Sequence, residues 1–281
     1  MALPAQFSPA SFSLTAVLAW GTSDFLGGYA TRRANAFLLT TIVNVSGWLL
    51  MAGIAIIVHA QFPSPHTIAW AMAGGASGGT GLAIFYRALA SGRMGLTAPV
   101  AALFGGGIPT IFGMVTEGLP SSIHIAGFLL AAIGIWLISR AEDGHTPEGV
   151  GLAVLAGIGF GGFYLCLRQA GDGSAMWIAT FSRSGALVVT AAVVLLQRSF
   201  RQITPAGFVW GTLAGFLDVT GTFMFVRARQ TGRLDSAVVL TSLYPAFTVL
   251  LARLFLKEHF TRWKAVGMFA ALLAIPLIAG R

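Results

Sequence analysis

Apolar residues form long continuous runs along this chain, and most charged residues fall in the short stretches between them. A helix needs about 20 consecutive apolar residues to cross the hydrocarbon core of a bilayer. Runs of about that length occur at residues 10–30, 37–58, 67–88, 94–115, 121–139, 150–169, 175–196, 205–226, 234–255 and 262–280. Spanning strands would show about ten-residue segments of alternating polarity instead. The pattern predicts an all-α membrane protein with ten transmembrane helices.

A stretch of the chain is repeated at an offset of 140 residues. TGLAIFYRALASGR (80–93) and TGTFMFVRARQTGR (220–233) agree at seven of fourteen positions. The same offset also aligns Trp70 with Trp210, Gly75 with Gly215, and Gly127 with Gly267. The sequence therefore predicts a first five-helix repeat at 1–140, a linker at 141–149 and a second five-helix repeat at 150–281.

Five helices per repeat is an odd number, so the second repeat must enter the membrane from the opposite side. Inverted repeats are common in secondary transporters, whose substrate binds near the midplane between the halves. Arg93 and Arg233 would then end equivalent helices at opposite faces, as parts of two half-gates. The alternative is that the repeated residues record a duplication and serve only helix packing.

Proline and glycine mark the fourth and ninth predicted helices as candidate cavity walls. Proline removes a backbone donor, and unbonded backbone groups at membrane depth are tolerated only against protein or a wet cavity. Pro99 and Pro109 lie in the fourth helix, and the offset aligns Gly105 with Pro245 in the ninth. We expect a helix breaker at one equivalent place in both repeats.

Composition agrees with a membrane protein. Charged residues make up 9% of the chain, against about 25% in an average soluble domain. The net charge is +8, but the bases stand singly or in pairs at helix ends, which favours contact with anionic lipid over nucleic-acid binding. Cys166 is the only cysteine, so an intrachain disulfide is excluded. No metal-binding or phosphate-binding motif occurs, and we expect no cofactor.

Three charged residues lie well inside predicted helices: Asp24, Arg183 and Asp218. A charge at the bilayer centre costs at least about 2.5–3.5 kcal/mol, so such residues usually face a cavity or each other. One Arg and two acids predict one ion pair and one spare carboxylate. Burial favours the neutral form of a spare acid, which makes it a candidate proton carrier. The alternative is a purely structural pair, with the other acid in the headgroup region.

Several short motifs resemble one transporter family in their order and spacing. Trp20 and Gly21 lie in the first helix, prolines lie in the fourth and ninth, and those two helices end at Glu117 and Glu258. The whole chain resembles the EamA-type branch of the drug/metabolite transporter superfamily. The resemblance implies a carrier of the bacterial inner membrane that exports amino acids or other small metabolites. It also implies a cavity built from helices one, three, four, six, eight and nine, which favours Asp24 as the spare acid.

Aromatic residues in these helices are the candidate cavity lining, with Asp24 as a polar anchor. They are Trp20, Tyr86, Phe104, Phe160, Tyr164 and Tyr244. Such a mixture is typical of a mostly apolar pocket with few polar groups. The alternative is that individual rings face lipid or pack between helices.

The sequence leaves the membrane orientation open. Ten Lys and Arg fall on the side reached after the first helix and five on the other, so the positive-inside rule places both termini outside. The resemblance implies cytoplasmic termini, and we adopt it because an inverted repeat copies basic residues to both faces.

The predicted function is export of small organic metabolites, amino acids first among them, by alternating access, with proton coupling as a further hypothesis. The expected partners are a small-molecule substrate, the lipid bilayer and protons, and the expected state is a monomer. Rival functions are a passive facilitator, a lipid or nucleotide-sugar carrier, which would want a more cationic cavity, and an intramembrane serine hydrolase. GASG at 75–78 matches a serine-protease pattern, but all five histidines lie in loops or at helix ends, where none can activate a buried serine. We therefore expect no enzyme.

Overall fold

The structure is a computed structural model, and it describes residues 9–31, 34–90, 94–139, 150–197, 204–256 and 261–279. Its helices are α1 (Pro9–Thr31), α2 (Ala36–Ile57), α3 (Pro65–Ala90), α4 (Met94–Glu117), α5 (Ser122–Ser139), α6 (Val150–Gln169), α7 (Ala175–Gln197), α8 (Pro205–Thr231), α9 (Leu234–Thr241), α10 (Tyr244–Leu256) and α11 (Arg262–Ala279). No strand occurs within these ranges. The predicted linker at 141–149 lies outside them.

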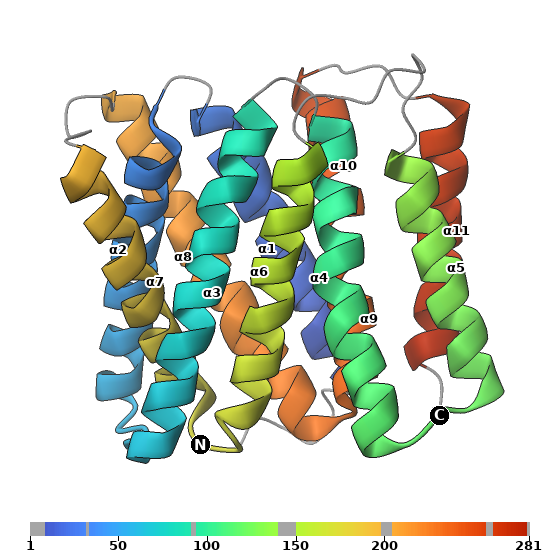
Figure 1. The fold of residues 1–281 in the computed structure, drawn as a ribbon, viewed down its shortest axis with the longest axis horizontal. Helices are drawn as coiled ribbons and strands as arrows, with labels where there is room; N and C mark the ends of the chain where they lie inside the picture. Colours follow the sequence, from blue (N-terminus) through green and yellow to red (C-terminus); the bar gives the residue numbers. More distant parts are fainter. Residues whose placement is uncertain are drawn as a thin grey trace.

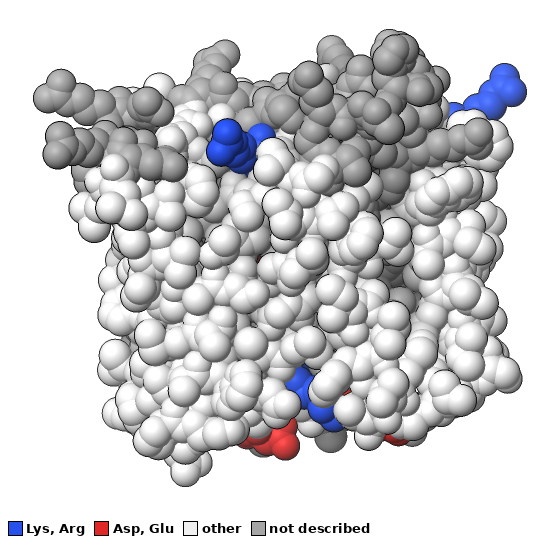
Figure 2. Space-filling model, viewed as in Figure 1, with Lys and Arg blue, Asp and Glu red and all other residues white. Residues whose placement is uncertain are grey.

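Seven helical segments of the described chain are long and apolar enough to cross a membrane. They are α2, α3, α4, α6, α7, α8 and the segment formed by α9 and α10, and α5 is a shorter apolar helix. In the face shown in Figure 2, the middle of the molecule is covered by uncharged side chains, and the charged ones that are drawn lie toward its upper and lower edges. The prediction of an all-helical membrane protein is confirmed.

The helices stand side by side with their axes roughly along one direction (Figure 1). The α5–α11 pair occupies one end of the molecule, and α2, α7 and α8 occupy the other. Between them, α1 contacts α8 and α10, α3 contacts α6 and α7, and α4 contacts α6 and α9. The helices α1, α3, α4, α6, α9 and α10 therefore form the middle of the bundle.

Caps and prolines fix where helices begin. The Asn35 side chain accepts a hydrogen bond from Phe37 N at 2.9 Å at the start of α2. Thr204 accepts one from Gly207 N at 3.1 Å, and Pro205 opens α8. Both are typical N-terminal signals, since a cap satisfies free N–H groups and proline at the first position lacks one.

The ninth predicted span differs from the expectation of one helix at 234–255. It is divided into α9 and α10, with Ser242 and Leu243 as a turn between them. Pro245 follows the turn, and its missing N–H cannot continue the hydrogen-bond ladder of α9. The helix that the repeat predicts to be its equivalent, α4, runs without a break through Gly105 and Pro109. The expected break at equivalent places is therefore seen only in the second half.

Glycine allows helices to approach backbone to backbone. A β-carbon at Gly75 of α3 would lie 1.7 Å from the carbonyl oxygen of Ser182 in α7. One at Gly215 of α8, the residue aligned with Gly75 by the repeat, would lie 2.3 Å from the carbonyl oxygen of Val43 in α2. Small residues at both contacts are the usual means of tight helix association in membranes.

Candidate functional site

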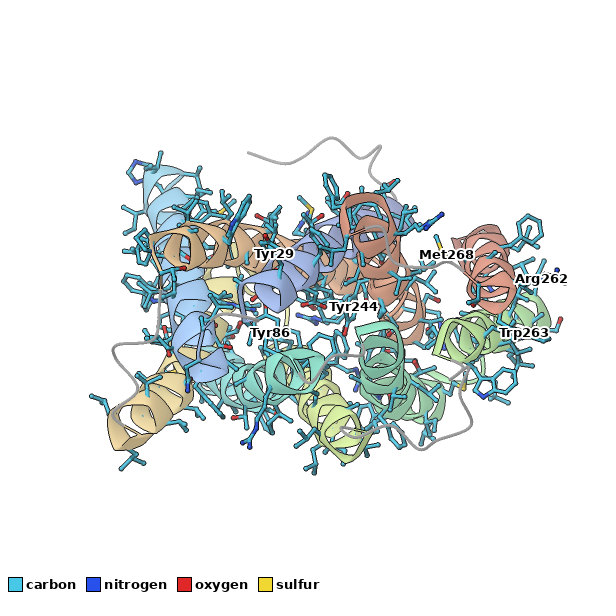
Figure 3. All side chains as sticks on the ribbon, turned by 90° about the horizontal axis from the view of Figure 1, so that it is seen from above. Tyr29, Tyr86, Tyr244, Arg262, Trp263 and Met268 are labelled. Carbon is cyan, nitrogen blue, oxygen red and sulfur yellow. The ribbon has the colours of Figure 1, made fainter. Side chains whose placement is uncertain are left out.

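A cavity lies between α1, α3, α6, α7, α8 and α10. Its volume is about 60 Å³, room for a few water molecules at about 10–15 Å³ each. It is lined by Trp20, Asp24, Gly75, Gly78, Gly79, Leu82, Phe160, Phe163, Tyr164, Arg183, Ala186, Asp218, Thr222 and Tyr244. Figure 3 shows Tyr244 near the middle of the bundle, whereas Trp263 lies at the periphery. The lining is mostly apolar, with one charged cluster.

An aromatic cluster surrounds Trp20. Its ring centroid lies 6.0 Å from that of Tyr164, 6.2 Å from Tyr244 and 6.3 Å from Phe163, each in an edge-to-face arrangement. Edge-to-face pairs place the positive ring edge against a negative face and add to the stability of burial. The rings come from α1, α6 and α10, so the cluster joins three helices at the cavity.

The Trp-Gly pair in α1 is explained by its two neighbours. Trp20 Nε1 donates a hydrogen bond to the carbonyl oxygen of Asp218 in α8 at 3.1 Å. A β-carbon at Gly21 would lie 2.8 Å from the carbonyl oxygen of Tyr244, and Thr248 donates its hydroxyl to the Gly21 carbonyl at 3.1 Å. Trp20 thus fixes α1 to α8, and Gly21 lets α10 approach.

Arg183 and Asp218 form a buried ion pair between α7 and α8. The guanidinium also donates to Thr222 Oγ1 at 2.7 Å and to Asn44 Oδ1 at 3.4 Å. Whole-residue exposure is 6% for Arg183 and 8% for Asp218. A buried pair is tolerated when further hydrogen bonds satisfy its polar atoms, and Asn44 and Thr222 supply them for the two Nη atoms of Arg183.

Asp24 is the other acid of the cavity. It is 6% exposed and lies one turn beyond Trp20 on the same face of α1, since residues four apart are neighbours on a helix. No residue in the described part of the chain makes a hydrogen bond or ion pair with it. The cavity therefore holds one paired and one unpaired carboxylate.

The structure brings together most of the candidate residues named from the sequence. Trp20, Asp24, Phe160, Tyr164, Arg183, Asp218 and Tyr244 line the cavity. Tyr86 is buried in α3 but is not part of the lining; its ring lies under Gly27 of α1, where a β-carbon would be 2.4 Å from the phenol.

Phe104 was expected in the lining and is not there. It is 41% exposed on α4, and its β-carbon lies at the close α4–α6 contact, where a β-carbon at Gly157 would be 2.6 Å away. Arg93 and the side chain of Pro99 lie outside the described part of the chain. Sequence reasoning missed Phe163 and Thr222, although each lies three or four residues from a named residue on its own helix.

Arg233 belongs to a network that connects three helices at the edge of the bundle where α4 and α6 end and α9 begins, which is the lower edge in Figure 1. It donates to both carboxylate oxygens of Asp235, at 3.1 and 2.7 Å, and to the carbonyl oxygens of Glu117 and Gly118. Glu117 forms an ion pair with Arg168 at 3.3 Å and accepts from the Leu234 backbone N–H. The hydrogen bond with Asp235 raises the pKa of Arg233 above its usual value. The network joins the end of α4 to the end of α6 and the start of α9.

The serine of the protease-like pattern has a packing role. Ser77 Oγ donates to the carbonyl oxygen of Gly159 in α6 at 2.9 Å. A β-carbon at Gly159 would meet the backbone of Gly81 at 2.9 Å. Ser77 therefore belongs to the close α3–α6 contact.

Comparison with known proteins finds one family whose model matches the second half of the chain. Residues 147–280 match the model of the EamA-like transporter family. A solved crystal structure of another protein matches with a TM-score of 0.79 over 96% of this chain and 97% of that chain. Its sequence identity is 17%, so this likeness shows the fold alone. No curated protein sequence matches significantly. Residues 147–280 are thus similar to the EamA-like transporter family, and the apolar helices of the described chain indicate a multi-pass membrane protein.

Proposed function

We propose that this protein is a secondary transporter that exports small organic metabolites by alternating access between two inverted five-helix repeats. The observation that carries the proposal is the cavity between the halves, with a buried carboxylate at Asp24 that has no partner in the described chain. Ionisable groups inside a membrane are costly, and they commonly mark substrate or proton pathways.

Helix contacts support ten spans in two equivalent halves. If α1 to α5 exchange in order with α6 to α11, with α9 and α10 as one span, the α1–α8 contact becomes α6–α3. In the same way the α2–α8 contact becomes α7–α3, and the α4–α6 contact becomes the contact of α9 and α10 with α1. Both members of each of these pairs of contacts are present in the structure. The α2–α7 and α5–α11 contacts map onto themselves. A duplicated fold would produce this pattern.

Residue contacts at the cavity follow the same rule. A β-carbon at Gly221 would lie 2.5 Å from Cδ1 of Trp20, and one at Gly81 would lie 3.3 Å from Cδ1 of Phe160. The offset of 140 residues relates both glycines and both rings. In each half, therefore, an aromatic residue of the first helix lies over a glycine of the third helix of the other half.

The lower-edge network is the proposed closed gate of this state. Arg233 and Glu117 hold the ends of α4 and α6 against the start of α9, and Arg93 is the proposed equivalent at the opposite face. The turn before Pro245 is the proposed hinge of the second half, and Pro99, Gly105 and Pro109 are proposed for the first. Opening this edge would require the network to break.

Asp24 is the proposed proton carrier. An unpaired carboxylate in a largely apolar cavity favours its protonated form, and exposure to either side of the membrane would let it exchange that proton. The charge of Asp218, by contrast, is neutralised by Arg183. The proposal therefore gives the two acids different roles.

Amino acids are the first substrates to test, in a bacterial inner membrane with both termini cytoplasmic and the protein monomeric. The experiment is solute flux in proteoliposomes with and without an imposed pH gradient. A coupled carrier accumulates solute against its gradient only when the pH gradient is present. Flux that never exceeds equilibration would make the protein a passive facilitator instead.

A further inference from the structure

We infer that the cavity recognises the ammonium group of its substrate and disfavours a substrate carboxylate, so that amines bind better than the corresponding amino acids. The inference rests on the proposed transport function and names the substrate class of the same cavity. It follows from which charged groups of the lining are already paired and which is not.

The unpaired ionisable group of the cavity is an acid, which is negative once it has released its proton. Asp24 is 6% exposed, lines the cavity and has no hydrogen-bond or ion-pair partner within the described ranges. An ammonium group offers three donors, and a charged hydrogen bond to a carboxylate is about twice as strong as a neutral one. An ammonium ion and a proton would occupy Asp24 in turn, which agrees with its proposed role in coupling.

The positive charge of the lining is already committed. Both Nη atoms of Arg183 are used, by Asp218, Asn44 and Thr222, and its Nε atom is buried away from any partner. A substrate carboxylate would have to displace Asp218, which would leave a buried acid uncompensated. It would also meet Asp24 and Asp218, and like charges at close range cost several kcal/mol. Anions are therefore disfavoured. An amino acid can bind through its ammonium group, but its carboxylate makes it bind more weakly than the corresponding amine.

Aromatic rings of the lining suit the same cation. Trp20 lies one turn from Asp24, and the rings of Tyr164 and Tyr244 are within 6.2 Å of the indole, centroid to centroid. A cation within about 6 Å of such ring faces is attracted by their quadrupoles. The rest of the lining, including Leu82, Phe163 and Ala186, is apolar and suits a hydrocarbon body. The class of ligand is thus a small organic amine with an apolar substituent.

The experiment compares matched ligands that differ only in their charged groups. Isobutylamine, valine and 3-methylbutanoate form a small series, and phenethylamine, phenylalanine and 3-phenylpropanoate form a larger one. Binding is measured as the concentration-dependent rise of the unfolding midpoint of the purified full chain, because a ligand that binds only the folded state stabilises it. We expect each bound amine to have a dissociation constant at least about tenfold lower than its amino acid, because the like-charge cost of several kcal/mol exceeds the 1.4 kcal/mol of a tenfold change. The carboxylic acids should give no shift.

The Asp24→Asn variant removes the charge and keeps the shape of the side chain, and it should abolish the amine-dependent shift. Asp172→Asn is the matched control, because the Asp172 side chain is 84% exposed at the surface and this variant should respond as the wild type does. The inference is overturned if an amino acid or a carboxylic acid binds more tightly than its amine, if no amine binds, or if Asp24→Asn keeps the shift. Should Asp24→Asn fail to fold, the ligand series on the wild-type protein still decides. If other metabolites are transported but no amine binds, the inference about amines fails and the transport proposal stands. If amines bind but no solute is transported, the transport proposal fails and the amine-binding site stands.

Discussion

Thr80 and Thr220 each donate a hydroxyl hydrogen bond to the carbonyl four residues earlier, at 2.7 Å in both cases. Phe85 and Phe225, also related by the repeat, are both fully buried. These identities, like the paired glycines under Trp20 and Phe160, are explained by packing within helices and between the two halves. The packing alternative therefore accounts for most of the repeated stretch, while Gly92 and Arg93 lie outside the described residues.

The close approach at Gly221 gives a prediction about stability. Its β-carbon would lie 2.5 Å from Cδ1 of Trp20, and overpacking of this kind costs about 1–3 kcal/mol. Gly221→Ala should lower the unfolding midpoint of the purified protein. Gly53→Ala is the matched control, since nothing lies within 4 Å of its β-carbon and alanine is the better helix former. Equal midpoints for the two variants would show that α1 and α8 are not in contact as described.

The two buried acids should behave differently when neutralised. Asp218→Asn leaves Arg183 as an uncompensated buried charge, at a cost of about 3–5 kcal/mol, so expression and thermal stability should fall sharply. Asp24→Asn removes a charge that has no partner among the described residues, and it should remain folded. Expression level and unfolding midpoint of the two variants test this, and the reverse order of stability would mean that Arg183 pairs with Asp24.

At the scale of helices, the apolar runs predicted the described helices apart from the division of the ninth span, with most ends within a few residues, because each span must satisfy its backbone hydrogen bonds internally. Two features could not be predicted. Sequence gives the position of a residue along a helix but not the rotation of that helix, so Phe104 was wrongly expected in the cavity and Thr222 was missed. The break beside Pro245 has no counterpart in α4, since proline removes one donor but the surrounding contacts decide whether the helix divides.

The lower-edge network predicts a measurable change in helix mobility. Glu117→Gln removes the ion pair with Arg168, and both of these side chains are partly exposed. The closed form of this edge should therefore lose about 1 kcal/mol of stability, which is roughly a fivefold rise in the fraction of molecules with the edge open. Cys166 lies two residues from Arg168 and is the only cysteine of the chain. Its rate of modification by a maleimide should rise in this variant.

Asp172→Asn is the control for that measurement. It removes an ion pair with Arg229 at the same edge, at 3.6 Å, but this pair is no part of the network that joins α4, α6 and α9. Its labelling rate should match that of the wild type. If Glu117→Gln also labels at the wild-type rate, the network does not hold this edge closed.

At the scale of the whole molecule, the proposed mechanism combines the cavity, the acid Asp24 that has no partner among the described residues, and the network at one edge. The most extensive helix contacts map onto one another when the proposed halves are exchanged, yet the charged residues are not repeated: the offset of 140 aligns Asp24 with Tyr164, Arg183 with Val43 and Asp218 with Gly78. In the proposed mechanism the symmetric scaffold supports two equivalent end states, and the asymmetric charge set allows one carboxylate to couple them. Asp24 is therefore the residue on which the proposed mechanism depends.

The most direct test is gradient-driven flux through the Asp24→Asn variant. Purified wild-type, Asp24→Asn and Asp172→Asn proteins are reconstituted, and accumulation of a transported solute is followed while a pH gradient is imposed. Proton coupling through Asp24 predicts that wild type and Asp172→Asn accumulate solute against its gradient and that Asp24→Asn does not. Accumulation by Asp24→Asn that depends on the pH gradient as fully as in the wild type would contradict it.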